Sequence, residues 1–161
     1  MTSSFEGDES AQREELMRRP SIEEVTARYQ EMLGRVRDAL ASEFPWIQWM
    51  QSDEIGRAGC AQFPAFRSDG ETRTLGIWTA NGNLPDAQWP RAQQLTEAVA
   101  REYGFGPVRA IVDRPSDHEV VSFDQYGANI KIGTAKNTVL SGGTDCHLPQ
   151  AVKERIASTG Q

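Results

Sequence analysis

The segment from Ser21 to Glu43 constrains the fold of this sequence more than any other part. Ser21 and Glu24 form a capping box, the pattern that opens a helix by covering its free end amides. Apolar side chains then recur at helical spacing: Ile22, Val25, Tyr29, Met32, Leu33, Val36 and Leu40. We therefore expect an amphipathic helix over 21–43, which has to bury its apolar stripe against another layer.

The rest of the chain adds a second helix and several short strands. The second helix is predicted from Asp86 to Tyr103, and Gly104 is suited to end it in a left-handed conformation. Strand-like runs occur at 72–80, 108–113, 119–125 and 128–134, with Val139-Leu140 as a further short strand. This order predicts an α+β fold, an antiparallel sheet with the two main helices packed on one face as a two-layer sandwich.

The length of 161 residues fits one domain with a single core. Residues 1–20 are polar and charged without a sustained period, which predicts a flexible N-terminal tether. We expect the single α+β domain over 21–149. Residues 150–161 then form a C-terminal tail, with a short helix as one option.

Composition excludes some partners and cofactors. The formal net charge of -6 and a pI of about 5.0 disfavour nucleic acid and anionic lipid surfaces, because both repel an acidic protein. No apolar run approaches the roughly 20 residues that span a bilayer. The glycine turn before Thr144 lacks the lysine and the spacing of a phosphate loop, and no other motif specifies a cofactor.

Cys60 and Cys146 are the two cysteines, and in an exported domain such a pair is first expected to form a disulfide. Closing so long a loop would stabilise the fold by roughly 4 kcal/mol. Three alternatives stay open: two reduced core cysteines in a cytosolic protein, a zinc site that adds His118 and His147, and a Cys146 nucleophile paired with His147. The zinc spacing is unusual, and adjacency in sequence does not show that two side chains meet.

Two further groups of side chains are candidates for chemistry. Trp46, Trp49 and Trp78 are candidate ligand-binding residues, although tryptophans more often pack in cores. Carboxylates near the predicted strands could include a general acid and base, although carboxylates at turns are more often solvated or capping. These are Asp113, Asp117, Glu119 and Asp124, with His118 beside them.

The C-terminal segment Thr144-Asp145-Cys146-His147-Leu148-Pro149, with Asn137-Thr138-Val139-Leu140-Ser141 before it, resembles the closing signature of the LppA-like lipoproteins of mycobacteria and related actinobacteria. Further segments agree in order: Arg18-Arg19-Pro20, Ala58-Gly59-Cys60-Ala61, Ala87-Gln88-Trp89 and Tyr103-Gly104-Phe105. The resemblance covers about residues 17–149. Asp145 departs from the family pattern, which usually has glycine there.

The resemblance implies an extracytoplasmic domain, anchored to the outer face of the cell membrane through a lipid that this chain does not carry. A Cys60–Cys146 disulfide would persist in that compartment. The resemblance implies no reaction and no catalytic residues. Our leading hypothesis is non-enzymatic binding of an envelope component or a partner protein, through the sheet face or the region of Trp46 and Trp49. The alternative is a hydrolase or transferase that acts on envelope material.

Overall fold

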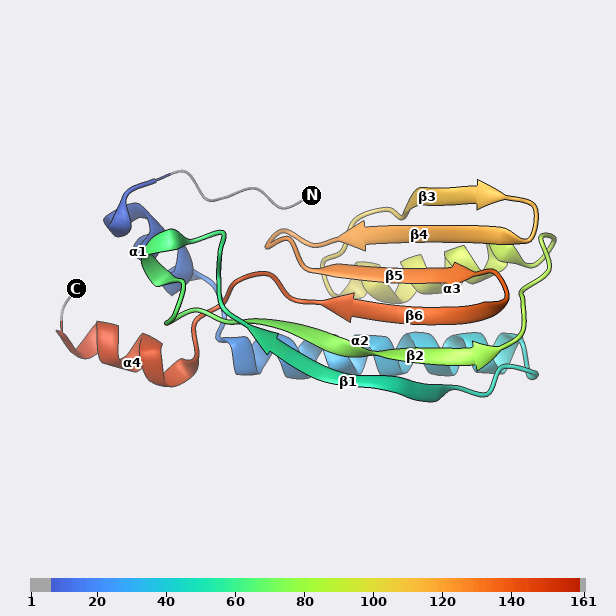
Figure 1. Cartoon of the computed structure of the whole chain (residues 1–161), viewed down its shortest axis with the longest axis horizontal. Helices are drawn as coiled ribbons and strands as arrows, with labels where there is room; N and C mark the ends of the chain where they lie inside the picture. The colour runs from blue at the N-terminus through green and yellow to red at the C-terminus, as the bar shows by residue number, and fades with distance from the viewer. Residues whose placement is uncertain (1–6, 160–161) are drawn as a thin grey trace.

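A computed structural model describes residues 7–159 as a six-stranded antiparallel sheet with two long helices behind it (Figure 1). The strand order is β1-β2-β6-β5-β4-β3. The strands are β1 (Met50–Ala58), β2 (Thr72–Asn81), β3 (Arg109–Arg114), β4 (Asp117–Phe123), β5 (Asn129–Thr134) and β6 (Asn137–Gly143). Helices α2 (Ile22–Glu43) and α3 (Trp89–Glu102) cover one face, which confirms the predicted α+β sandwich.

Helix α2 has the predicted boundaries, whereas α3 begins at Trp89, three residues after the predicted start at Asp86, and ends as predicted. The capping box at the start of α2 is present, with the Ser21 side chain on the Glu24 amide and the Glu24 side chain on the Ser21 amide. Pro90 lies in the first turn of α3, where its missing N–H is not needed. Gly104 follows α3 with φ 88°, the left-handed conformation that glycine adopts at low cost.

The core lies between the sheet and these helices. Val120, Ile132 and Leu140 face one another across β4, β5 and β6, and all three are buried. Side chains alternate between the two faces of a strand, so the neighbours of these residues point the other way. On that open face Val121, Lys131 and Ser141 form one cross-strand row of mixed character.

A second, smaller core closes one end of the molecule. It packs α1 (Glu9–Arg18), the short 3₁₀ helix η1 (Pro64–Phe66) and α4 (Gln150–Thr159) around a cluster that includes the fully buried Leu16. The tether predicted over 1–20 is therefore wrong for residues 9–18, which fold as a helix, while residues 1–6 lie outside the described part. The short helix expected in the C-terminal tail is present as α4.

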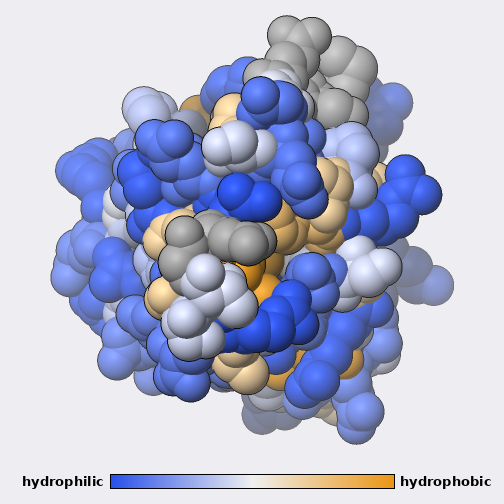
Figure 2. Space-filling view, turned by 90° about the vertical axis from the view of Figure 1, so that its left-hand side faces the viewer, coloured by the Kyte–Doolittle hydropathy of each residue, from blue (hydrophilic) through white to orange (hydrophobic). Residues whose placement is uncertain are grey.

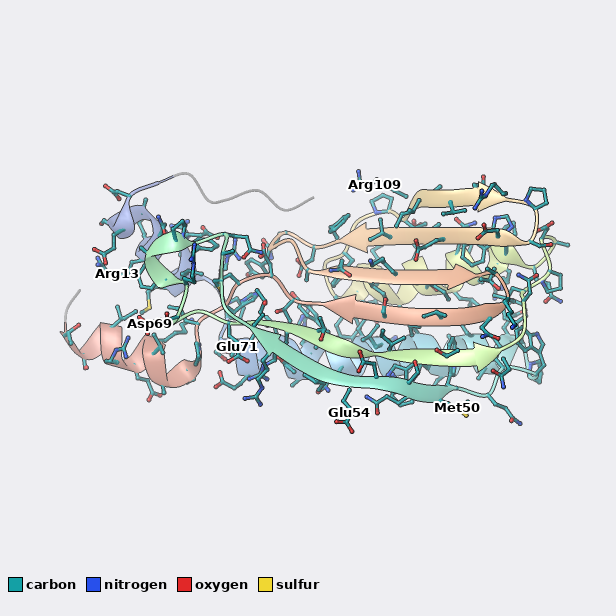
Figure 3. All side chains as sticks on the ribbon, viewed as in Figure 1. Arg13, Met50, Glu54, Asp69, Glu71 and Arg109 are labelled. Atoms are coloured by element: carbon teal, nitrogen blue, oxygen red, sulfur yellow. A yellow bond between two sulfur atoms is a disulfide. The ribbon has the colours of Figure 1, made fainter. Side chains whose placement is uncertain are left out.

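Strand β1 is a strand that the sequence analysis does not predict. This edge strand is exposed at almost all of its nine residues, so it shows no apolar alternation. Met50 and Glu54 project from this edge, and Arg109 marks β3 at the opposite edge (Figure 3). Strand β6, expected only as the short pair Val139-Leu140, extends over seven residues in the middle of the sheet.

Candidate functional site

The three tyrosines of the chain, Tyr29, Tyr103 and Tyr126, line one pocket of about 310 Å³. The pocket lies where α2 starts, α3 ends and β4 turns into β5. Arg28, from α2, and Asp124, which directly follows β4, also line it. Pro20, Val25, Gly104 and Gln125 complete the wall.

The turn between β4 and β5 is built around the Asp124 carboxylate. Its Oδ1 accepts hydrogen bonds from the backbone N–H groups of Tyr126 and Ala128, both at 2.9 Å. Gly127 completes the turn with φ 92°. This side-chain-to-backbone pattern fixes Tyr126 at the edge of the pocket.

Tyr29 forms the inner wall. Its hydroxyl donates a hydrogen bond to Asp124 Oδ2, and its ring packs edge-on against Phe105 with the centroids 5.5 Å apart. Burial, followed by the contact with Asp124, raises the pKa of Tyr29 far above its ordinary value. The phenol therefore keeps its proton and remains a neutral hydrogen-bonding group.

Tyr103 forms the opposite wall and carries two arginines over its ring. Its hydroxyl donates to Glu31 at 2.8 Å and accepts from Arg35 at 3.3 Å, and Arg35 also binds Glu102 through both terminal nitrogens. The guanidinium of Arg28 lies 5.1 Å from the centre of the ring. Within residues 7–159, Arg28 makes no hydrogen bond and no ion pair, and it is exposed.

Tyr126 is held from behind by the smaller core. The Arg19 guanidinium lies 5.6 Å from its ring centre, and His147 meets the ring edge-on at 5.4 Å. Arg19 in turn donates to the Cys146 carbonyl oxygen and to Glu15. The pocket wall is thus connected to the Cys60–Cys146 disulfide, which lies close to Asp69 (Figure 3).

Comparison with known families identifies the family of this chain. Residues 2–150 match the sequence profile of LppA, described as a lipoprotein confined to pathogenic Mycobacterium. The chain belongs to the LppA family. The match spans most of the chain, including every element of the pocket, and it agrees with the resemblance that the closing segment shows.

Two crystal structures share the LppA fold seen here. The putative lipoprotein LppA from Mycobacterium tuberculosis matches with a TM-score of 0.70 at 13% identity, over 89% of this chain and 90% of that one. A DUF4853 family protein from Actinomyces odontolyticus matches with a TM-score of 0.60 at 16% identity, over 81% of this chain and 70% of the other. None of the curated proteins compared with the chain matches it.

The disulfide distinguishes the hypotheses about the two cysteines of this LppA-family chain. Cys60 and Cys146 are bonded to each other across 86 positions, and both are fully buried. A reduced pair, a zinc site and a cysteine nucleophile each require a cysteine whose sulfur is not in a disulfide. All three alternatives are therefore wrong. Among the described residues, no group of three or more His, Cys, Asp or Glu side chains is arranged to hold a metal ion. Residues 7–159 also contain no helix with the length and apolar composition that a membrane crossing requires.

The tryptophans predicted as ligand-binding residues lie outside the tyrosine pocket. Trp49 and Trp78 pack against the core under α2, where Trp49 Nε1 donates to the Arg37 carbonyl and the Arg37 guanidinium lies 3.8 Å from the Trp78 ring centre. Trp46 is 40% exposed and covers Gly82 in the turn after β2. Trp49 and Trp78 thus contact the same arginine, and a binding role for the three stays a prediction.

Three of the four carboxylates predicted to include an acid and base pair lie in the β3–β4 hairpin, and the fourth, Asp124, lies in the tyrosine pocket. His118 binds Asp113 at 3.0 Å through Nδ1 and Asp86 at 2.7 Å through Nε2, and it stacks on Trp89. Burial lowers the pKa of His118, but the bonds to Asp86 and Asp113 outweigh it and the net pKa is raised. The other carboxylates are placed as follows: Asp117 pairs with Arg114, Glu119 opposes Val112 on the open face, and Asp124 lines the pocket.

A second hollow lies between α1 and α4. Figure 2 shows this end as mainly hydrophilic around a small hydrophobic area, and Phe66 and Ile156 supply the apolar lining of the hollow. Its charged groups pair with one another, since Arg155 lies 3.2 Å from Asp69 and Arg13 lies 3.9 Å from Glu9. The hollow therefore offers a ligand fewer free polar groups than the tyrosine pocket does.

Sequence reasoning did not find the tyrosine pocket. Tyr103-Gly104 was assigned to the end of a helix and Tyr126-Gly127 to a turn, and both assignments hold. The available signal was weak: Tyr103 lies at a helix end and Tyr126 in a turn, whereas Tyr29 lies within the apolar stripe of α2. Nothing in their spacing shows that the three places meet.

Proposed function

We propose that this LppA-family chain is the extracytoplasmic domain of a membrane-anchored binding protein, which holds a small polar component of the cell envelope in the tyrosine pocket. The observation that carries the proposal is the convergence of all three tyrosines with an unpaired arginine in one cavity. Small-molecule sites combine aromatic walls with a few polar groups in this way. The volume of about 310 Å³ is at the lower end for such sites, about 300–1,000 Å³, which favours a ligand of one or two rings.

Two observations of different kinds support the location. The family is described as a lipoprotein, and the disulfide belongs to an oxidising compartment outside the cytoplasm. The anchor that the family implies would precede α1, and Arg19, directly after α1, contacts the pocket residue Tyr126. The pocket would therefore lie beside the small core that carries α1, the helix that leads to the anchor.

A catalytic role draws less support from the geometry. Of the carboxylates in residues 7–159, Asp124 alone lines the pocket, and it already accepts three hydrogen bonds. Both ring nitrogens of His118 are occupied by carboxylates, which leaves no nitrogen to take a proton from a nucleophile. Binding without reaction is thus the simpler function.

The test uses the tyrosines as reporters. Protein with ¹³C in its tyrosine rings gives signals from three residues, and each lies in the pocket wall. Titration with glucose 6-phosphate, glucuronate and methyl glucoside should shift these signals saturably for at least one compound. Tyr126→Ala should abolish the binding that is seen by calorimetry, whereas Trp46→Ala, which removes an exposed aromatic elsewhere, should leave it intact.

The opposite pattern would overturn the proposal. If Trp46→Ala removed binding while Tyr126→Ala kept it, the site would be the tryptophan region that the sequence analysis predicts. If none of the three compounds moved the tyrosine signals, the pocket would not be a site for ring-shaped polar ligands.

A further inference from the structure

We propose that the ligand of the tyrosine pocket carries an anionic group, a phosphate or a carboxylate on a hydroxylated ring, and that the Arg28 guanidinium binds this anion. The inference rests on the proposed function and adds the chemical class of the ligand. It starts from the unpaired state of Arg28 at the pocket.

Arg28 has two carboxylates within helical reach, and both are bound elsewhere. Glu24, four residues earlier, closes the capping box with Ser21. Glu31, three residues later, accepts the hydroxyl of Tyr103 at 2.8 Å. Side chains at these spacings normally pair along a helix. The fold therefore directs both acids away from the guanidinium.

The third nearby acid, Asp124, is also committed. Its two oxygens accept from the Tyr29 hydroxyl and from the N–H groups of Tyr126 and Ala128. In the part of the chain that the structure describes, Arg28 thus has no ion-pair partner, although the chain has a net charge of -6. A guanidinium presents five N–H donors in a flat fork, which matches the oxygens of a phosphate or a carboxylate.

The two other arginines near the pocket give an internal comparison. Arg19 is bound to Glu15 and to the Cys146 carbonyl, and Arg35 is bound to Glu102 and to the Tyr103 hydroxyl. Both hold the walls in place. Arg28 stacks on a wall but leaves its N–H groups free, as expected of a group that binds a ligand and does not support structure.

The remaining pocket groups indicate what the anion is attached to. Within the described residues, the Tyr126 hydroxyl and the Gln125 amide form no hydrogen bonds, so both are available to hydroxyl groups. The tyrosine rings offer apolar faces to the C–H groups of a sugar or polyol ring. Asp124 repels an anion and so orients the charged end of the ligand toward Arg28.

The experiment compares four probes on the full chain: glucose 6-phosphate, glucuronate, methyl glucoside and inorganic phosphate. Affinity is measured by calorimetry, and the ¹³C tyrosine signals show whether the pocket is occupied. We expect an anionic sugar to bind at least about tenfold more tightly than methyl glucoside, as a charge-assisted hydrogen bond provides. Arg28→Gln should remove this preference, and Arg28→Lys should restore part of it.

Arg91→Gln is the matched control, because Arg91 is an exposed arginine on α3 that does not line the pocket. It should leave all affinities unchanged. Binding of glucose 6-phosphate alone would identify a phosphate-bearing ring, and binding of glucuronate alone would identify a carboxylate-bearing one.

Two results would overturn the inference and leave the proposed function standing. One is equal binding of methyl glucoside and the anionic sugars, with tyrosine shifts that Arg28→Gln does not alter. The other is equal binding of inorganic phosphate and glucose 6-phosphate, which would remove the ring from the ligand. Absence of tyrosine shifts with all four probes would overturn both proposals.

Discussion

The guanidinium of Arg19 donates a 2.9 Å hydrogen bond to the carbonyl oxygen of Cys146, which lies 127 residues further along the chain. The same side chain binds Glu15 at 2.8 Å and lies 5.1 Å from the centre of the Phe63 ring. Arg19 is buried. One side chain thus connects the end of α1, the segment before η1 and the residue that carries the disulfide.

Replacing Arg19 should weaken the smaller core more than the rest of the protein. Arg19→Gln removes the donor to the Cys146 carbonyl and one of the two arginines that bind Glu15, and a loss of this kind costs about 1–3 kcal/mol. Arg19→Lys should rescue only part of it, because an ammonium does not form the same fork. Urea unfolding gives the cost, and Arg13→Gln, which loses only a 3.9 Å ion pair with the exposed Glu9, should change stability by less than about 1 kcal/mol. Equal effects of the two would contradict the role assigned to Arg19.

The disulfide should contribute much of the stability. A closed loop of 86 residues stabilises the folded chain by about 4 kcal/mol in the chain-entropy model. The oxidised protein should show no free thiol under denaturing conditions, and the Cys60→Ser, Cys146→Ser double variant should unfold at a clearly lower urea concentration. Two free thiols in protein from an oxidising compartment would contradict the bond.

Gly70 should be intolerant of any side chain. A Cβ at this position would lie 2.6 Å from Cys60 Sγ and 2.8 Å from Cys146 Sγ, so the disulfide packs directly on the glycine. Gly70→Ala should therefore destabilise the protein by about 1–3 kcal/mol. Gly104→Ala is the control, because its Cβ meets nothing within 4 Å and only the positive φ opposes it. We expect it to cost about 1 kcal/mol. A larger loss for Gly104→Ala than for Gly70→Ala would show that the disulfide can move aside.

His147 should make the fold sensitive to mild acid. Burial lowers its pKa to about 4, and Nε2 is the one buried side-chain polar atom of the described residues without a partner. The unfolded chain takes up a proton near pH 6.5, whereas the folded chain does so only near pH 4. The contribution of the neutral His147 to the free energy of unfolding is therefore complete above about pH 6.5, and it is lost as the pH falls toward 4. The expected loss is about 2 kcal/mol between pH 7 and pH 5.

The measurement is the slope of unfolding free energy against pH. His147→Asn keeps a donor for the Pro20 carbonyl but does not titrate, so the slope should flatten even if the variant is less stable overall. His118, the other histidine of the chain, has a raised pKa and gives the opposite sign. Its contribution is complete below about pH 6.5 and is lost as the pH rises through the folded value. An unchanged acid slope in His147→Asn would contradict the assignment.

The sequence predicted those elements whose signals are local. The capping box at Ser21, the left-handed Gly104 and the alternation in β4 and β5 each depend on a few neighbouring residues. The long helix α2 and the sandwich followed from them. Edge strand β1 was not predicted, because a strand exposed on most of its surface has no apolar alternation.

Helix α1 and the tyrosine pocket were not predicted for a different reason. The single fully buried apolar side chain of α1, Leu16, gives no apolar stripe, and the helix is held by contacts with segments over 40 residues away. The free state of Arg28 was also hidden, since Glu24 and Glu31 are spaced to pair with it along the helix. Only the folded structure shows that Ser21 and Tyr103 bind those acids instead.

The position of β6 sets the order in which the sheet is completed. β6 is the last strand in the chain, yet it lies between β2 and β5 and bonds to both. If the strands become available in chain order, β1 pairs first with β2. Strands β3, β4 and β5 then form a separate meander. The two pieces share no strand until residues 137–143 arrive. A chain crossing a membrane from its N-terminus would therefore leave two incomplete sheets exposed until residues 137–143 had passed, a period in which a chaperone would have edges to shield.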